Sequence, residues 1–572
     1  MDRFLVFRRR TLQTALQTAL VLLLAGCGGG GGGEQPIIDP PLGNGESAFD
    51  DPQAYSTSGT ASLAGAAEGA AVTRHSLTLG GTSIAYTARA GHLIARHPAT
   101  GAAEASMFYV AYTADGANAA TRPVTFFYNG GPGSASIWLH LGSFGPKRLA
   151  TGVPATSAAT PFPLVDNSES LLDNTDLVFV DAVGTGLSQA IAPFSNSSFW
   201  GVDADAALFR DFIVRWLAAN VRASSPRFLY GESYGGPRTA VLARRLQEAG
   251  VALDGLVLQS PALDYNSNCG VIGVGNCGGY LPTYGAIGAW HGLSVPVPTD
   301  IDAAMVDLRA FTDTRYTPAV AAVLAGAVPP ADLPPLLAGY TGIPAVNWTA
   351  QFNLQPGVFQ NSLFTNAVIG RYDGRMVATR GTPLAAEGDP SSTFITNSFA
   401  SVMADYLRHT LRYSNGSTYV LLGSAINSWD FSHSGRSLPD TVPDLAAALA
   451  ADPALRVLAV SGYHDLATPF RTTELDLARL GTDPRVQVRN YPGGHMSYLD
   501  DATRVRQKAD LAAFYRGTLA ANAARGVREL PQQRQARPNI DSAGTVPTTP
   551  QPVVPQAAVQ APLRDPWVPP RR

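Results

Sequence analysis

The apolar residues of this 572-residue chain gather into short runs separated by helical patterns. An early stretch, "HSLTLGGTSIAYTARAGHLIA" (75–95), alternates apolar and polar residues across glycine turns, as antiparallel strands do. Helical patterns follow over 203–220 and 237–249. The buried-strand runs lie at 124–129, 177–182, 227–231, 255–261, 456–462 and 486–492. Apolar strands that alternate with helices predict a largely parallel sheet with helices on both faces.

The alternation stops between residues 263 and 400, where Pro, Ala and Gly interrupt short helical fragments. We interpret this segment as an inserted cap over the carboxyl edge of the sheet, so that the main domain comprises 71–262 and 401–520. A Gly/Pro-rich stretch without periodicity, 27–70, predicts a flexible linker. The Pro/Gln-rich segment 521–572 predicts a disordered tail.

The first residues have the pattern of an export signal. Basic residues, Arg3 and 8–10, precede an apolar stretch at 15–24 that is too short to favour a membrane-spanning helix. The signal, 1–26, ends before Cys27 in "LLLAGC", which is typical of a bacterial lipoprotein whose cysteine carries the lipid anchor. The alternative is a plain secretory signal with an incidental cysteine. Both interpretations predict export, and the first predicts a periplasmic or cell-surface protein anchored to the membrane through lipid.

Charge and cysteine content limit the partners. The formal net charge is −3, and no Lys/Arg run stands out beyond the N-terminus, so we expect no nucleic-acid partner. Cys269 and Cys277 in "NCGVIGVGNC" lack metal-ligand spacing, and an oxidising exterior favours a disulfide between them. No other cluster has metal-ligand spacing, so we expect no metal and no cofactor. The sequence leaves the oligomeric state open.

The strongest chemical signal is Gly-x-Ser-x-Gly in "FLYGESYGG", placed between a predicted strand and a predicted helix. This pattern is a nucleophile elbow, which exposes Ser233 above the sheet. A serine needs a base, and the base needs an orienting acid. His495 follows a strand in "YPGGHM", and Asp465 follows one in "SGYHDL". His464 is a rival base, but a sequence neighbour of the acid points elsewhere. The order Ser, Asp, His is that of the α/β-hydrolase fold.

A tetrahedral intermediate also needs backbone donors for its oxyanion. The glycine turn "YNGGPGSAS" (128–136) follows a predicted buried strand. We expect the N–H groups of Gly131, in this turn, and Tyr234, next to the nucleophile, to form the oxyanion hole.

Four motifs, "NGGPGSAS", "DAVGTGLS", "GESYGGPR" and "GGHM", together resemble the serine carboxypeptidase family, peptidase family S10. The resemblance implies removal of single residues from the C-terminus of peptides through an acyl-enzyme. It also implies that Asn129 and Glu232 bind the substrate carboxylate and that Met496 lines the pocket for the leaving residue. Two carboxyl groups share a hydrogen bond only if one is protonated, so we expect a raised pKa for Glu232. "DAVGTGLS" lacks a P-loop lysine and is interpreted as a structural turn beneath the site.

The sequence departs from the family at three places. Ser134 replaces a cysteine, Phe127 replaces a tryptophan beside the carboxylate site, and the acid motif is "GYHD". These changes concern substrate preference more than catalysis. Two alternatives therefore stay open: an esterase or acyltransferase on the same triad, and a non-catalytic surface binding protein. Retention of Asn129 and Glu232 favours a peptide substrate over the esterase or acyltransferase alternative. The intact triad residues argue against a non-catalytic binding protein.

Overall fold

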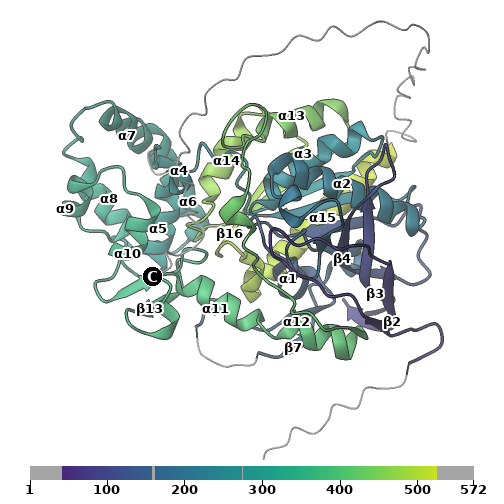
Figure 1. The fold of residues 1–572 in the computed structure, drawn as a ribbon. Helices are drawn as coiled ribbons and strands as arrows, with labels where there is room; N and C mark the ends of the chain where they lie inside the picture. Colours follow the sequence, from purple (N-terminus) through teal and green to yellow (C-terminus); the bar gives the residue numbers. More distant parts are fainter. Residues whose placement is uncertain (1–41, 157–161, 273–274, 525–572) are drawn as a thin grey trace, which may run out of the picture. The chain divides into compact units, whose positions relative to one another are not determined.

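The computed structural model describes residues 42–156, 162–272 and 275–524. The predicted signal 1–26, Cys27 and nearly all of the predicted tail lie outside the described residues. Six neighbouring parallel strands form one side of a ten-stranded sheet (Figure 1). In spatial order they are β16 (Val486–Tyr491), β15 (Arg456–Gly462), β11 (Gly255–Gln259), β10 (Arg227–Glu232), β5 (Val124–Tyr128) and β8 (Asp176–Val180). All six runs that the sequence assigned to buried strands are present.

Antiparallel strands extend this sheet at the β8 edge. β4 (Ala103–Ala114) pairs with β8, β3 (Thr82–Arg96) with β4 and β2 (Gly69–Leu79) with β3, while the short β9 (Gln189–Ala190) pairs with β4. Thr82 opposes Leu79 across the two-glycine turn at Gly80 and Gly81, whose φ angles are +55° and +83°. The alternating pattern at 75–95 therefore gives the predicted antiparallel hairpin.

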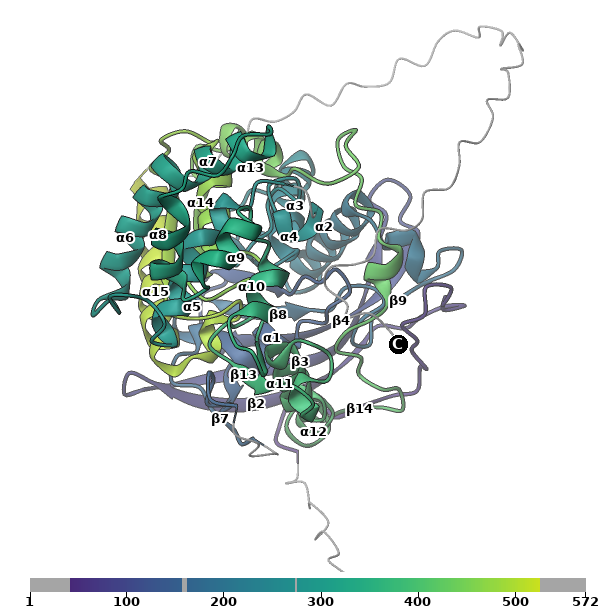
Figure 2. The same ribbon diagram turned by 90° about the vertical axis from the view of Figure 1, so that its left-hand side faces the viewer.

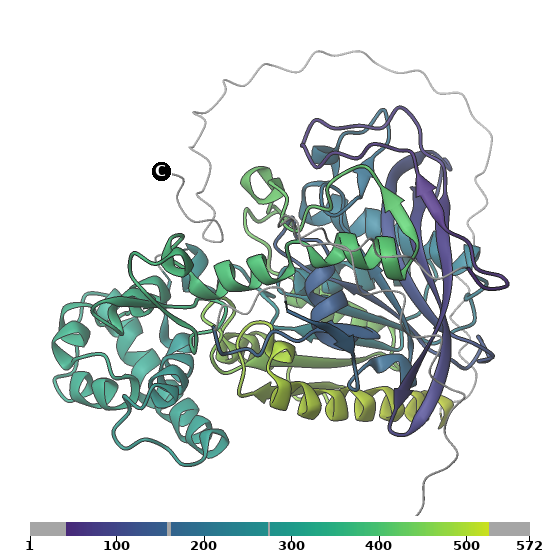
Figure 3. The same cartoon turned by 90° about the horizontal axis from the view of Figure 1, so that it is seen from below.

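Helices cover both faces of the sheet, as an α/β-hydrolase fold requires. Neighbouring residues of one strand enter different cores: Phe126 packs with α2 (Val202–Ala219), α3 (Gly235–Glu248) and α13 (Val442–Ala451), whereas Phe127 belongs to the opposite core. On that opposite face, Phe514 and Tyr515 of α15 (Asp501–Ala524) pack against Phe228 of β10. Figure 3 shows α15 running along the sheet.

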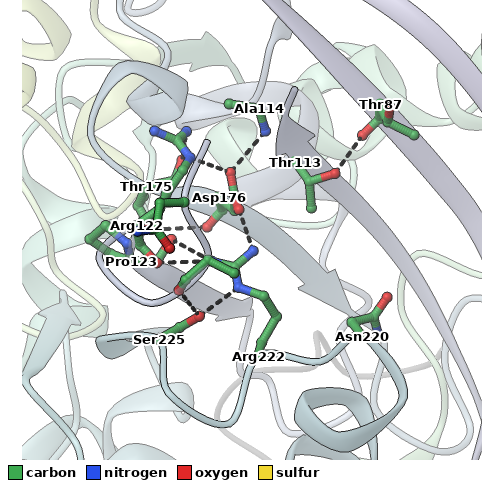
Figure 4. A network of polar contacts seen from close by, with 12 residues as sticks. Thr87, Thr113, Ala114, Arg122, Pro123, Thr175, Asp176, Asn220, Arg222 and Ser225 are labelled. Atoms are coloured by element: carbon green, nitrogen blue, oxygen red, sulfur yellow. Dashed lines mark hydrogen bonds and ion pairs between the residues drawn. The ribbon is translucent and has the colours of Figure 1, made fainter. Parts of the chain in front are cut away.

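A buried ion cluster holds the amino ends of the central strands together (Figure 4). Asp176, at the start of β8, is 2% exposed and accepts from Arg122 Nε at 2.6 Å and from the Ala114 N–H at 2.9 Å. Arg222, before β10, bonds the second carboxylate oxygen and donates to the Arg122 carbonyl at 2.9 Å. Because each charge is paired and hydrogen-bonded, burying it is tolerated. The cluster fixes the sheet at the end opposite to the carboxyl ends of the strands.

The predicted insertion contains a helical core, to which Tyr463, Leu466 and Phe470 of the main domain also contribute. Figure 2 looks onto its helices. Its helices are α4 (Cys269–Ile272), α5 (Leu281–Trp290), α6 (Ile301–Phe311), α7 (Thr317–Leu324), α8 (Leu333–Thr341), α9 (Ala345–Ala350) and α10 (Pro356–Ser362), followed by the hairpin β12 (Ala367–Ile369) and β13 (Val377–Thr379). Cys269 and Cys277 form a disulfide within this core. The last helix of the insertion, α11 (Pro390–Phe399), packs instead with the main domain, as does the next helix, α12 (Val402–Asp405).

The remaining elements are short. They are β1 (Phe49–Asp51), α1 (Ile137–Leu139), β6 (Lys147–Leu149), β7 (Leu164–Asp166), β14 (Tyr413–Asn415) and α14 (Phe470–Ala478). No helix in the described part of the chain has the length and apolar character that crossing a bilayer requires.

Residues 42–70, which we predicted as part of a flexible linker, pack on the main domain. β1 pairs in parallel with β14, Leu63 is buried, and the ring of Tyr55 stacks on His92 with centroids 4.4 Å apart. These apolar residues are too widely spaced to form a helix or strand pattern, so their packing leaves no periodicity in the sequence. The packed chain therefore begins well before residue 71.

Candidate active site

The predicted site residues meet at the carboxyl ends of the parallel strands. Asn129 follows β5, Ser233 follows β10, Asp465 follows β15 and His495 follows β16. Ligands of open parallel sheets bind at this edge because the loops there are free to converge. A cavity of about 120 Å³ is lined by Asn129, Gly131, Glu232, Ser233, His495 and Met496, among others.

Ser233 lies in a strained corner that only its glycine neighbours allow. Its φ angle is +61°, a left-handed conformation that is costly for a non-glycine residue. A Cβ on Gly231 would lie 2.2 Å from the Gly235 carbonyl oxygen, and one on Gly130 would lie 2.4 Å from the Tyr234 nitrogen. The Ser233 N–H donates to the Gln259 carbonyl at 2.9 Å, which fixes the turn against β11. The geometry is that of the predicted nucleophile elbow.

His495 and Asp465 form a buried pair. His495 Nδ1 lies 2.7 Å from Asp465 Oδ2, and the two residues are 1% and 0% exposed. Asp465 Oδ1 also accepts from the N–H groups of Ala467 at 2.7 Å and Thr468 at 3.1 Å. Burial disfavours the charged imidazolium, but the Asp465 carboxylate outweighs this effect and raises the pKa of His495 above its usual value. The Asp465 carboxylate therefore stabilises His495 in its protonated form.

Two hydroxyl residues that the sequence analysis missed support this pair. Thr468 Oγ1 lies 2.7 Å from Asp465 Oδ2 and 3.0 Å from His495 Nδ1. Ser260, which follows β11, donates from its Oγ to the His495 carbonyl at 2.7 Å. The only sequence signal for Thr468 is its position three residues after the acid, where side chains commonly bond back to a turn.

His464, the rival base, lies elsewhere. It does not line the cavity, and its ring packs edge-on against Trp290 with centroids 5.9 Å apart. Burial, together with the nearby Arg375 charge, lowers the pKa of His464 well below its usual value. The histidine that contacts Asp465 is therefore His495.

The glycine turn after β5 lies beside the nucleophile. Gly131 has a φ angle of +98° and lines the cavity with Ser233. Behind the turn, Asp181 Oδ1 accepts from the Ser136 N–H at 2.8 Å, from its hydroxyl at 2.7 Å and from the Tyr419 hydroxyl at 3.0 Å. The motif "DAVGTGLS", which begins at Asp181, thus anchors the turn as a structural element.

Asn129 and Glu232 are hydrogen-bonded to each other in the same cavity. Asn129 Nδ2 donates to Glu232 Oε1 at 2.8 Å, and the Tyr498 hydroxyl donates to Oε2 at 2.6 Å. Burial raises the pKa of Glu232 to about 7, although the His495 charge and these hydrogen bonds oppose the shift. A carboxyl group with this pKa is protonated in acidic solution, where it can donate to a second carboxylate.

The remaining cavity walls are mostly apolar. They come from Trp138, Ile395, Leu422, Ile426 and Met496. Trp138 stands on the α1 turn, and Ile395 stands on α11 with its neighbours Ser392 and Thr396 on the same helix face.

Two family departures have structural explanations. Ser134 Oγ accepts from the Trp138 indole N–H at 2.7 Å, so this serine orients a wall of the cavity. Phe127, which we expected beside the carboxylate site, is 0% exposed and lies between Phe179 and Tyr230, with ring centroids 4.8 and 4.9 Å away. It points into the sheet core because strand residues alternate between faces, and Trp138 supplies the aromatic wall instead.

Among the described residues, no three His, Cys, Asp or Glu side chains gather as a metal-ligand group.

The topology and the elbow define an α/β-hydrolase fold. Residues 82–271 match the family model described as serine carboxypeptidase. Over 180 residues the chain is 27% identical to serine carboxypeptidase-like 33 of Arabidopsis thaliana, covering 28% of this chain and 34% of the relative. Residues 82–271 are thus similar to the serine carboxypeptidase family, and the chain spans about a third of the length of this curated relative.

Solved structures also match. A prohormone-processing carboxypeptidase from Saccharomyces cerevisiae is 15% identical, with 75% of this chain and 91% of that chain covered and a TM-score of 0.47. A proline iminopeptidase from Mycobacterium smegmatis is 16% identical, with 75% and 99% covered and a TM-score of 0.34.

Proposed function

We propose that this protein is a serine carboxypeptidase that releases C-terminal residues from peptides through an acyl-enzyme at Ser233. The observation that carries the proposal is the buried Asn129–Glu232 pair, which lines one cavity with Ser233 and His495. A general hydrolase needs the nucleophile and base, whereas only a substrate that ends in a carboxylate needs a protonated carboxyl group beside them.

In the proposed mechanism His495 is the general base. It takes the Ser233 hydroxyl proton as the oxygen attacks the scissile carbonyl carbon, and Asp465 stabilises the resulting imidazolium. The N–H groups of Gly131 and Tyr234 donate to the oxyanion. The C–N bond then breaks and His495 protonates the departing amino group. Water, activated by the same base, hydrolyses the ester and frees Ser233.

Glu232 and Asn129 bind the substrate carboxylate in this proposal. Protonated Glu232 donates a hydrogen bond to it, with Asn129 and Tyr498 orienting the Glu232 carboxyl group. Ionisation of Glu232 above its pKa of about 7 places two negative charges together and weakens binding. Binding of the substrate carboxylate is therefore stronger in acidic solution.

The protein is proposed to act outside the cytoplasm, anchored to a bacterial membrane through lipidated Cys27. This rests on the sequence pattern at residues 1–27 alone. A Cys27→Ser variant that stays in the membrane fraction would contradict the anchor.

The function is tested with N-blocked dipeptides, the matching dipeptide amides and simple esters, each with wild type and Ser233→Ala. The proposal expects release of the free C-terminal amino acid by wild type alone, with the amides turned over more slowly. Ester cleavage without peptide cleavage would favour the esterase alternative. A folded wild type that is inert on all three substrates would overturn the proposal in favour of a binding protein.

A further inference from the structure

A short segment of the insertion, Arg371–Arg375, runs between the loops that carry Asp465 and His495; we call it the strap. Its backbone bonds both loops. The Arg371 carbonyl accepts from the Leu466 N–H at 3.0 Å, and the Gly374 N–H donates to the His464 carbonyl at 2.9 Å. These two bonds flank the acid, Asp465, on either side in sequence.

The strap bonds the base itself. The Tyr372 carbonyl accepts from the His495 N–H at 2.6 Å, and the two rings lie with centroids 5.1 Å apart. A Cβ on Gly494 would lie 2.4 Å from the Tyr372 carbonyl oxygen, so only glycine allows this approach. The close fit restricts how the His495 backbone can move.

The strap is fixed in turn to α11. Asp389 Oδ1, at the start of this helix, accepts from the Arg371 N–H at 3.0 Å. Ser391 Oγ accepts from the N–H groups of Tyr372 at 3.0 Å and Asp373 at 3.3 Å. Ser391 is 0% exposed, so water does not replace these bonds. The helix that holds the strap also supplies Ile395 to the cavity wall.

A buried arginine joins the far end of the strap to the chain after His495. Arg375 pairs with Asp373 at 2.7 Å and with Asp500 at 2.8 Å. Asp500 also caps α15 by accepting from the Thr503 N–H at 2.9 Å. The loop of the base is therefore tied to the strap at both its beginning and its end.

We infer that the strap makes the insertion part of the catalytic machinery, because it holds His495 and Asp465 at hydrogen-bonding distance from each other. Ser391 and Asp500 are the positioning residues that hold the strap. The inference rests on the proposed function. Proton transfer depends steeply on geometry, so a loosened base lowers the rate of the chemical step. Neither positioning residue lines the cavity, although Tyr372 of the strap does, so the loss in kcat should exceed any change in KM.

The test compares Ser391→Ala and Asp500→Asn with wild type on an N-blocked dipeptide. We expect kcat to fall about tenfold in each, a loss of the size that one hydrogen bond contributes, with KM within about twofold. Ser398→Ala is the matched control, because Ser398 is on the same helix but bonds only the Phe394 carbonyl of its own turn, at 2.7 Å. It should keep wild-type kcat. Rates are normalised to the Ser233 sites that react with a fluorophosphonate, which removes any loss of folded protein.

A double-mutant cycle with Asp465→Asn separates positioning from general destabilisation. If the strap acts through the Asp465–His495 pair, Ser391→Ala should cost less than about twofold in the Asp465→Asn background. An equal tenfold loss in both backgrounds, or an unchanged kcat in both positioning variants of an active enzyme, would overturn the inference. An inactive wild type would instead refute the proposed function.

Discussion

Replacing Glu232 with glutamine should remove the pH dependence of carboxylate recognition. Burial raises the pKa of Glu232 to about 7, so wild type carries a proton there in acidic solution and loses it in mildly alkaline solution. Glutamine keeps a neutral side chain of similar shape at every pH, and it can still accept from Asn129, which now bonds Oε1 at 2.8 Å.

The expected size follows from the titration. With a pKa of about 7, nearly all of Glu232 is protonated at pH 5 and about a tenth is at pH 8, so binding that needs the proton weakens about tenfold. The pKa of His495 is also raised, by the Asp465 carboxylate, and the protonation of this base affects turnover of any substrate. The ratio of kcat/KM for a dipeptide to that for its amide cancels the His495 contribution, because both substrates use the same base.

The assay is this ratio, measured from pH 5 to pH 8 for wild type and Glu232→Gln. Wild type should lose about tenfold in the ratio, and the variant should stay flat within about twofold. Equal pH profiles in the two proteins would refute the assignment of Glu232 as the group that binds the substrate carboxylate.

Protein stability gives an independent reading of the same pKa. The folded pKa of about 7 lies above the ordinary value of 4.5, so between these values the unfolded chain loses a proton that the folded protein keeps. Wild-type stability should therefore fall by about 3 kcal/mol as pH rises from 4.5 to 7, with no further change from this group above 7. Denaturant unfolding should show no such contribution in Glu232→Gln.

Three further substitutions have distinct expected effects. Thr468→Val removes the hydroxyl that bonds both the acid and the base, and should lower kcat about tenfold with little change in KM, as steady-state kinetics would reveal. His464→Gln should retain kcat, because this ring packs on Trp290 outside the cavity; loss of activity in a folded variant would reopen the choice of base. The cavity wall offers no charged side chain except Glu232 and the base, so substrates with an apolar residue next to the scissile bond should outcompete lysine analogues at least tenfold in kcat/KM. Ile395→Asp should narrow that ratio, and an unchanged ratio would remove Ile395 from the specificity wall.

The sequence predicted the part of the structure that depends on local patterns. Most of the parallel strands are runs of apolar residues. The corner at Ser233 is predicted by neighbouring glycines, whose missing Cβ atoms leave room for the turn. The rule that loops converge at the carboxyl edge of a parallel sheet then brought Asp465 and His495 to the same place. Their contact at 2.7 Å agrees with the prediction, while their catalytic roles stay predictions.

The parts that the sequence did not predict depend on contacts between distant segments. Phe127 was placed beside the site by resemblance, but the face of a strand residue depends on register, and Trp138 occupies the cavity wall. The strap contacts His495 from more than a hundred residues away, through backbone groups that carry no side-chain pattern. The packing of Tyr55 on His92 is equally non-local.

Mass spectrometry of an unmodified peptide incubated with the protein at pH 5 is the most direct test of carboxypeptidase activity at Ser233. A serine carboxypeptidase should produce a ladder of products, each shorter by one residue at the C-terminus, and Ser233→Ala should leave the peptide intact. Internal cleavage, loss of residues from the N-terminus, or an identical ladder with Ser233→Ala would contradict this activity.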